Sequence, residues 1–428
     1  MKIPFLILLF LFCFQYPGYG EDYSFDLSET EKKPYHIGGY TEFNPVLFRL
    51  NHESSLYKLG FYNKDEGSSI EEYHFRLQLE GSYEKGISRF FVRTNSELNH
   101  SYSGWDDKTD IYEGYLSVKP SSSLKIDFGK KTLKWGKGYA WNPAAFIDRP
   151  KDPDDPEQSL EGFIVGSADY IRSFDGDLKT LSFTPVLIPV YEHINDDFGE
   201  INHLNFAAKV YLLLYDTDID FVFMTGASRT RRYGMDFSRN ISANFEIHAE
   251  IAYLEDYEKR YTDENGNISE QKQDVQNWLL GIRYLTEHDT TFIAEYFHNA
   301  AGYTSDETKD FFSFIDKGYD AYISDENDSL LNKASALREK YGRNPLKDYL
   351  YLRVSQKEPF DILYFTPSLS CIFNMNDKSF SLSPELLYNG ITNLEMRLKA
   401  GFIYGKEDTE YGEKQNDCRM ELRLRYYF

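Results

Sequence analysis

The sequence predicts an all-β fold, a transmembrane antiparallel β-barrel of about 18 strands (16–18), on three observations. Segments in which apolar and polar residues alternate recur along the chain, as in strands with two different faces. The connections between these segments alternate between short and long, which sorts short periplasmic turns from long external loops. Aromatic residues make up 17% of the chain, with 35 Tyr and 33 Phe, a composition typical of strands and of membrane-interface girdles.

The alternation is strictest at the carboxyl terminus, over residues 418–428. An apolar face carries Cys418, Met420, Leu422, Leu424, Tyr426 and Phe428, and the opposite face carries Arg419, Glu421, Arg423, Arg425 and Tyr427. A last strand of this kind, ending on Phe, resembles the closing strand of bacterial outer-membrane β-barrels. The resemblance implies that the barrel-assembly machinery recognises Phe428.

The amino terminus predicts export. Residues 1–20 have a short basic start and an apolar core too short for a membrane helix, as in a secretory signal peptide. We expect residues 21–36 to form a short periplasmic tail and residues 37–428 to form the barrel. After the signal peptide, no segment has the uninterrupted apolar length that a membrane helix needs.

Composition argues against several function classes. The formal charge of −22 disfavours nucleic acid as a partner. After the signal peptide only Cys371 and Cys418 remain, at apolar strand positions, so neither a disulfide framework nor a metal site is expected. We expect no bound cofactor.

Eighteen strands follow from the alternation. They are predicted at 37–50, from 73 to a turn at 83–86, 87–98, 109–119, 124–133, 162–174, 178–189, 203–215, 219–229, 232–241, 244–256, 274–286, 291–303, 347–357, 361–373, 379–389, 393–404 and 418–428. The long connections include 134–161, 190–202, 257–273, 304–346 and 405–417. The loop 304–346 is predicted to contain a helix at 329–341, whose apolar stripe must pack on the rim, on other loops or inside the barrel as a gate.

The long loop after the fifth strand carries the most distinctive motif. Its residues 134–138 read Lys-Trp-Gly-Lys-Gly, followed by Trp-Asn-Pro at 141–143 and an acidic Asp-Pro run. This segment resembles that of porin-like barrels related to alginate-export and other carbohydrate channels. Its two Trp rings suit either packing on the barrel wall or stacking on a sugar. The candidate constriction residues are Trp135, Lys137, Tyr139, Trp141 and Arg149.

Strand parity places a set of charged residues on the lumen side. The candidate pore-lining residues are Arg283, Arg353, Arg397, Lys399, Arg419, Glu421, Arg423 and Arg425. In one register of the last two strands, Lys399 opposes Glu421 and the charges form neutral pairs. Shifted by two residues, Lys399 opposes Arg423, and the like charges would form an anion-selective wall.

The sequence therefore predicts a porin-like channel of the bacterial outer membrane for passive diffusion of small polar or anionic solutes, with saccharides as one option. The alternatives are the barrel sheath of an electron conduit, another structural barrel, or a hydrolase with its site at the rim. No nucleophile motif supports the hydrolase, so we expect no enzyme and no catalytic residues. The expected partners are outer-membrane lipid, the assembly machinery and small polar solutes; a homo-oligomer or a periplasmic or extracellular protein partner stays open.

Overall fold

The computed structural model describes residues 33–64, 67–341 and 345–428, and residues Tyr35–Phe428 form a closed ring of 18 antiparallel strands. Each strand pairs with the strands before and after it in the sequence, and β1 pairs with β18. The ring has no free edge, so its backbone N–H and C=O groups find partners within the sheet, as a lipid environment requires. The predicted fold and strand count are confirmed.

The strands lie close to the predicted segments. Their bounds are β1 Tyr35–Leu50, β2 Ser69–Lys85, β3 Ser88–Ser101, β4 Gly104–Ser121, β5 Leu124–Lys131, β6 Phe163–Ser173, β7 Leu178–Val190, β8 His203–Leu214, β9 Thr217–Thr225, β10 Arg232–Ser242, β11 Phe245–Thr262, β12 Ile268–Leu285, β13 Thr290–His298, β14 Asp348–Gln356, β15 Phe365–Asn374, β16 Phe380–Ile391, β17 Leu394–Tyr404 and β18 Asn416–Tyr427. The helices are α2 Ser55–Phe61, α3 Ser305–Asp325, α4 Ser329–Tyr341 and the 3₁₀ turn η2 Pro359–Asp361. The predicted signal peptide and most of the predicted tail lie outside the described residues.

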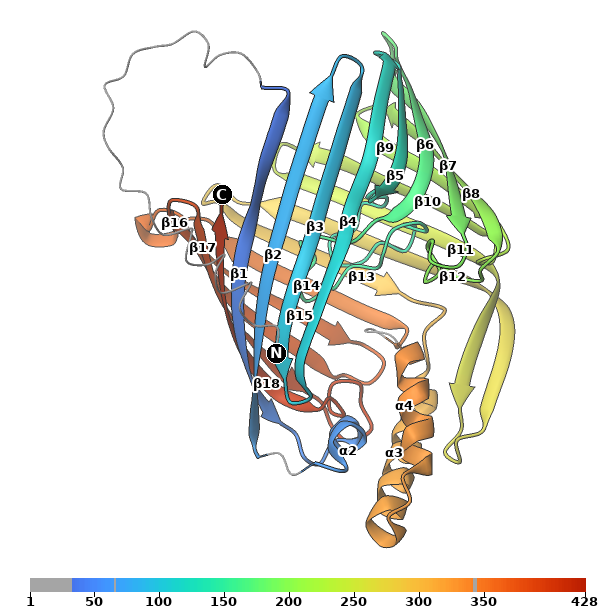
Figure 1. Ribbon diagram of the computed structural model, residues 1–428, viewed down its shortest axis with the longest axis vertical. Helices are drawn as coiled ribbons and strands as arrows, with labels where there is room; N and C mark the ends of the chain where they lie inside the picture. Colours follow the sequence, from blue (N-terminus) through green and yellow to red (C-terminus); the bar gives the residue numbers. More distant parts are fainter. Residues whose placement is uncertain (1–32, 65–66, 342–344) are drawn as a thin grey trace. The chain divides into compact units, whose positions relative to one another are not determined.

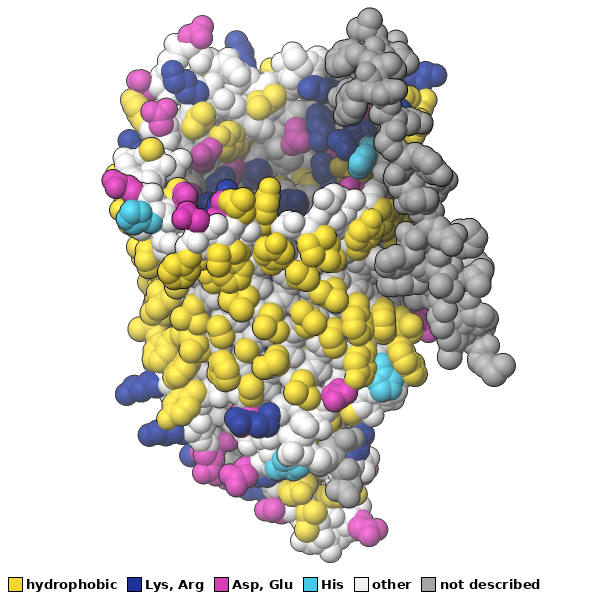
Figure 2. Space-filling view, turned by 90° about the vertical axis from the view of Figure 1, so that its left-hand side faces the viewer, with side chains coloured by type: hydrophobic (Ala, Val, Ile, Leu, Met, Phe, Trp, Pro, Cys, Tyr) yellow, Lys and Arg dark blue, Asp and Glu magenta, His cyan; other side chains and the backbone are white. Residues whose placement is uncertain are grey.

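Apolar side chains form a belt across the face of the barrel shown in Figure 2, and exposed apolar residues of the other strands extend it around the ring. They belong to alternate positions of the strands, while the positions between them face the lumen. Exposed members of the belt include Leu79, Leu116, Phe128, Leu187, Phe221, Leu280, Phe292, Leu352, Leu386, Leu398, Met420 and Leu422. Because large apolar side chains in water are unfavourable, a belt of this extent is the surface of a chain embedded in lipid.

The two ends of the barrel differ, as predicted. Connections such as 86–87, 122–123, 215–216 and 392–393 define the short-turn end, and β18 also finishes there, where the Phe428 N–H donates to Gly39 O at 3.1 Å. Helices α2, α3 and α4 of the described residues lie together at the opposite, long-loop end (Figure 1). No helix in the described part of the chain is long and apolar enough to cross a membrane.

Several predicted boundaries were wrong at the long-loop end. The predicted loop 257–273 is mostly strand, because β11 and β12 continue as a hairpin with its turn at 263–267. Strand β13 ends at His298 instead of residue 303, and helices α2 and α3 stand where no helix was predicted. Alternation predicts strands whose two faces differ, and neither a polar hairpin nor a helix carries that period-two signal.

Helix α4, which the sequence predicted, packs on α3 and α2. Leu331, Ala334 and Leu337 of α4 share one apolar cluster with Phe311 and Ile315 of α3. Of the three locations open to its apolar stripe, the structure shows packing among the external loops, on α3 of the same loop and on α2 of the connection between β1 and β2. The turn at Gly266 of the β11–β12 hairpin also touches this cluster: a Cβ there would lie 2.4 Å from the ring of Phe314. The helices and the hairpin tip therefore form one small external core.

The belt makes a direct prediction about lipid exposure. Leu280 is 54% exposed on the outer face of β12, five residues from the end of that strand. We expect Leu280→Arg to destabilise the barrel by about 2–4 kcal/mol, because a cation near the bilayer midplane loses its hydration. Equilibrium urea unfolding in liposomes measures this, with Leu280→Phe as the control. Equal unfolding free energies for the two variants would contradict a lipid-facing position.

Candidate pore constriction

The connection between β5 and β6, residues 132–162, lies inside the barrel. Trp135 packs against wall residues of β7–β9, β11 and β12, including Val186, Met224 and Ala252. Trp141 packs against a second part of the wall, with its ring centroid 5.3 Å from that of Phe297. We call residues 132–162 the inward loop.

Both Trp rings of the inward loop are occupied by packing. Trp135 is 4% exposed and Trp141 is 7% exposed, so neither offers a face to a solute in this structure. Of the two roles that the sequence left open for these rings, the structure shows packing on the wall. The rings therefore hold the loop in place instead of lining a sugar site.

Glu250 of β11 fixes the first half of the inward loop. Its buried carboxylate accepts hydrogen bonds from the backbone N–H groups of Lys137 at 2.6 Å, Gly138 at 2.6 Å and Ala144 at 3.1 Å. The Asn142 side chain donates to the same carboxylate at 3.0 Å. One wall carboxylate thus satisfies several loop N–H groups that would otherwise be buried without partners.

Glu295 of β13 acts in the same way next to Glu250. It accepts hydrogen bonds from the backbone N–H groups of Tyr139 and Ala140, the latter at 2.8 Å. His248 of β11 lies beside it, with Nε2 2.9 Å from a Glu295 oxygen. These contacts bind the loop to the wall formed by β11–β13.

Gly136 and Lys137 contact the acidic residues of the barrel wall directly. Gly136 has φ +89°, and a Cβ there would lie 2.8 Å from a Glu250 oxygen, so a larger residue would push the carboxylate away. Lys137 extends to β9 and β10, with Nζ 2.9 Å from Asp220 and 3.9 Å from Asp236. The Trp-Gly-Lys-Gly motif is therefore the part of the loop that binds the acidic wall.

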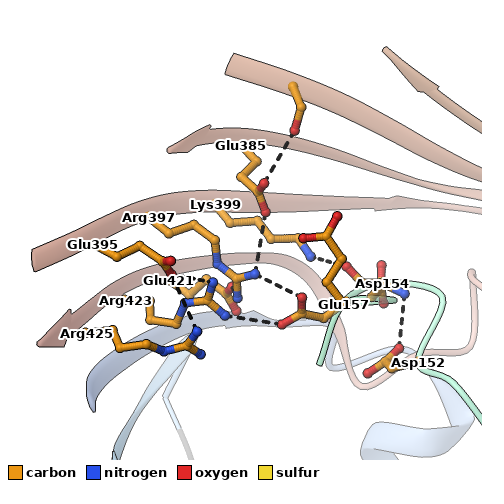
Figure 3. A network of polar contacts seen from close by, with 12 residues as sticks. Asp152, Asp154, Glu157, Glu385, Glu395, Arg397, Lys399, Glu421, Arg423 and Arg425 are labelled. Carbon is orange, nitrogen blue, oxygen red and sulfur yellow. Dashed lines mark hydrogen bonds and ion pairs between the residues drawn. The ribbon is translucent and has the colours of Figure 1, made fainter. Parts of the chain in front are cut away.

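The acidic part of the inward loop reaches the opposite wall, at β17 and β18 (Figure 3). Asp155 lies between two guanidinium groups, 3.1 Å from Arg397 Nη1 and 3.5 Å from Arg423 Nη1. Asp154 accepts a hydrogen bond from Lys399 Nζ through its backbone oxygen, and its carboxylate lies 3.8 Å from Arg419. The loop therefore spans the lumen from one wall to the other.

The register of β17 and β18 is the first of the two considered, in which Lys399 opposes Glu421 and Glu395 opposes Arg425. The same register puts Arg397 opposite Arg423, and nearby acids neutralise both of them. Salt bridges join Arg397 to Glu421 at 2.8 Å, Arg423 to Glu395 at 2.9 Å and Arg425 to Glu42 at 2.6 Å. We call Arg397, Lys399, Arg419, Arg423 and Arg425 the basic strip.

Asp155 is ionised in this arrangement. Burial alone would raise the pKa of its carboxyl, but Arg397 and Arg423 outweigh burial and hold that pKa below its ordinary value. The carboxylate therefore supplies a fixed negative charge that neutralises the basic strip from the loop side.

A cavity of about 350 Å³ remains between the acidic part of the inward loop, the basic strip and strands β1–β3. Neutral polar side chains, among them Asn44, Asn99 and Gln158, alternate with charged ones along its wall. Its carboxylates are Glu42, Glu97, Asp152, Asp154, Asp155 and Glu421, and its cationic groups are Arg76, Arg397, Lys399, Arg419 and Arg423. A hollow with gathered Lys and Arg side chains is visible above the belt in Figure 2.

The remaining predicted residues lie apart from this cavity. Arg353 pairs with Glu385 at 3.5 Å, and Arg149 binds Asp197 at 2.5 Å, which joins the inward loop to the connection 191–202. Arg283 is exposed near the short-turn end of β12. His193, in the connection 191–202 at the long-loop end, has an 88% exposed side chain and lies 3.8 Å from Glu192.

Strand parity also places Glu250 and Glu295 on the lumen side, but it does not predict that they hold the loop. Their spacing on β11 and β13 resembles that of any inward charge, and the N–H groups they bind come from a loop far away in sequence. Two sequence features could have indicated this role. The segment 246–250 places Glu, His and Glu on the inner face of a strand, and the loop 134–138 is rich in glycine. Alternation cannot match those two features to each other.

The comparisons with known proteins show the fold. No protein-family model matches the chain, and no curated protein sequence matches it. Solved structures of Pseudomonas aeruginosa OccK9 (OpdG) and Acinetobacter baumannii OccAB1 are similar, with TM-scores of 0.53 and 0.52 and identities of 9% and 10%. The alignments cover 92% of this chain in both cases, and 98% and 96% of those chains. The barrel fold and its apolar belt place the chain in a bacterial outer membrane.

Removing the Glu250 carboxylate tests how the loop is held. We expect Glu250→Ala to release the inward loop, because its N–H groups lose a charged acceptor that contributes about 1.5–3 kcal/mol per hydrogen bond. Single-channel recording should then show larger and noisier conductance. The control is Glu246→Ala, an inward acid of the same strand that bonds Ser238 Oγ at 3.1 Å. Identical recordings for the two variants would contradict the role of Glu250.

The connection 405–415, at the long-loop end of the barrel, contains a buried acid. Glu410 accepts hydrogen bonds from Tyr349 Oη and Asn374 Nδ2, both at 2.7 Å, while its second oxygen is buried without a partner among the described residues. Burial raises the pKa of Glu410 to about 7, against the lowering effects of Lys414 and the two hydrogen bonds. Glu413 of the same connection accepts a hydrogen bond from the N–H of Ser55 at 2.6 Å, next to α2.

This raised pKa predicts a pH dependence of stability. The folded state keeps a proton that the unfolded state releases, so the free energy of unfolding should fall as pH rises from about 4.5 to about 7. Glu410→Gln should reduce that slope, measured as urea midpoints in liposomes at pH 5 and pH 8. Glu407→Gln, an exposed acid of the same connection, should keep it. A slope in Glu410→Gln as steep as that of the unaltered protein would refute this assignment.

Proposed function

We propose that this protein is a porin-like channel that lets small polar solutes diffuse passively across the outer membrane. The observation that carries the proposal is the charged cavity of about 350 Å³ beside an inward loop that is bound to both walls. A loop fixed in this way narrows the lumen without filling it. The proposal includes no catalysis and no cofactor.

The charge of the cavity favours solutes that are neutral or carry both signs. Six carboxylates and five cationic groups line it, so their fields largely cancel over the width of the cavity. The basic strip is paired by Glu421, Glu395 and Glu42, and by Asp155 of the loop. An anion-selective wall needs unpaired cations, so this pairing supports weak charge selectivity instead of the anion preference that the unpaired strip would give.

A preference for saccharides stays a prediction of the motif resemblance alone. Stacking on Trp135 or Trp141 would require an exposed ring, and both rings are buried. The amide and hydroxyl groups of a small polar solute can instead exchange hydrogen bonds with Asn44, Asn99 and Gln158. We therefore propose recognition by hydrogen bonds with little contribution from aromatic stacking.

Conductance tests the proposal directly. The purified protein, reconstituted in planar bilayers, should form ion-conducting channels with weak selectivity between potassium and chloride. Liposomes containing it should also swell in small neutral sugars or zwitterionic amino acids. A folded barrel without conductance or swelling would overturn the channel and favour a sheath or another structural barrel.

Asp155 should set the charge preference of the constriction. We expect Asp155→Asn to raise chloride permeability over potassium permeability several-fold, because Arg397 and Arg423 lose the carboxylate between them. The reversal potential in a potassium chloride gradient measures the ratio. Asp216→Asn, the same charge change at an exposed short turn, is the control. An unchanged ratio in Asp155→Asn would place the permeation path elsewhere.

A further inference from the structure

The connection between β14 and β15, residues 357–364, is unusual among the turns at the periplasmic, short-turn end. The other described connections there have two to four residues, such as 122–123 and 215–216. This one contains η2 and reads Lys-Glu-Pro-Phe-Asp-Ile-Leu-Tyr. Two antiparallel strands can be joined by far fewer residues, so its length needs another explanation.

Four residues of this connection are large apolar side chains that are exposed on the surface. Phe360 is 93% exposed, Ile362 48%, Leu363 62% and Tyr364 58%. Neighbouring large apolar side chains in water are unfavourable, and such a patch marks a contact with a partner or a membrane.

Two of the exposed residues of this turn have left-handed backbone conformations. Phe360 and Tyr364 have φ of +59° and +63°, a region that bulky side chains rarely adopt. Hydrogen bonds hold it there, from Glu358 N–H to Phe365 O at 2.8 Å and from Tyr364 N–H to Glu358 Oε1 at 2.9 Å. The exposed conformation is therefore built into the turn by its own hydrogen bonds.

The turn lies level with the barrel rim. On one side the Lys357 N–H donates to Asp289 O at 3.1 Å, and on the other the Asn389 N–H donates to Tyr364 O at 3.0 Å. Both partners belong to the ends of neighbouring hairpins, so the turn is bonded between them. Figure 1 shows it as the orange coil at the left edge, beside β16.

The apolar patch continues the lipid-facing belt. Phe365 and Tyr388 form a cross-strand pair directly beside the turn, and Leu369 and Leu386 follow on the same outer face. The turn also contains the exposed Asp361, a carboxylate that would stay among headgroups and water.

We infer that residues 358–364 form an interfacial membrane anchor, with Phe360, Leu363 and Tyr364 inserted among the lipids of the periplasmic leaflet. Membrane lipid is the occupant because the patch is level with the rim and continuous with the belt. The anchor holds this side of the barrel at a defined depth in the bilayer. It is independent of the channel proposal, since the readout below does not depend on conductance.

Spin labelling tests the depth of the turn. A nitroxide is attached at Phe360→Cys in a Cys371→Ala and Cys418→Ala background, and the full barrel is reconstituted in phosphatidylethanolamine and phosphatidylglycerol liposomes. Ser122→Cys, in an exposed turn at the same end, is the matched control, and heat-modifiable migration on gels confirms folding of both. We expect the label at 360 to collide several-fold more with oxygen, and several-fold less with a water-soluble nickel chelate, than the label at 122.

Two outcomes would overturn the anchor. Collision rates at 360 equal to those at 122 would place the turn in water. Protection of the label from both oxygen and the chelate would show that protein covers the turn, as in contact with a second copy of the chain.

Discussion

Closure of the strand ring between β1 and β18 is the constraint on which the other features depend. The pairing runs from Tyr40 opposite Tyr427 to Leu50 opposite Asn416, so that both ends of the described barrel join in one ladder. In lipid each unpaired backbone group costs several kcal/mol, and an open edge would expose a row of them. Once the ring is closed, alternate side chains must face either lipid or the lumen. The apolar belt and the polar interior follow from that single choice.

The polar interior raises a second requirement, because carboxylates held inside a barrel need partners. Glu250 and Glu295 find theirs in the backbone N–H groups of the inward loop, and Asp220 finds its partner in Lys137. The loop in turn lacks regular secondary structure, so its own N–H groups need acceptors. The wall carboxylates and the loop N–H groups therefore satisfy one another, and a cavity remains beside the loop.

The basic strip shows how register converts a sequence pattern into a charge distribution. Five cations on adjacent strands would repel one another if left alone. The observed register puts Glu421 beside Arg397 and Glu395 beside Arg423, and the loop adds Asp155 between the two guanidinium groups. The wall that the alternation marks as basic is therefore close to neutral where the lumen is narrowed. The proposed weak charge selectivity rests on this balance.

The sequence by itself determined the barrel, its eighteen strands, the sorting of its turns, the outward face of Met420 and Leu422, and the helix at 329–341. These features depend on local periodicity, which neighbouring residues record. Only the tertiary structure decided that Trp135 and Trp141 pack on the wall, that Glu250 binds a loop more than a hundred residues away, and that Asp155 neutralises Arg397 and Arg423. Such pairings join segments distant in sequence, and period-two alternation says which way a side chain points without saying what it meets.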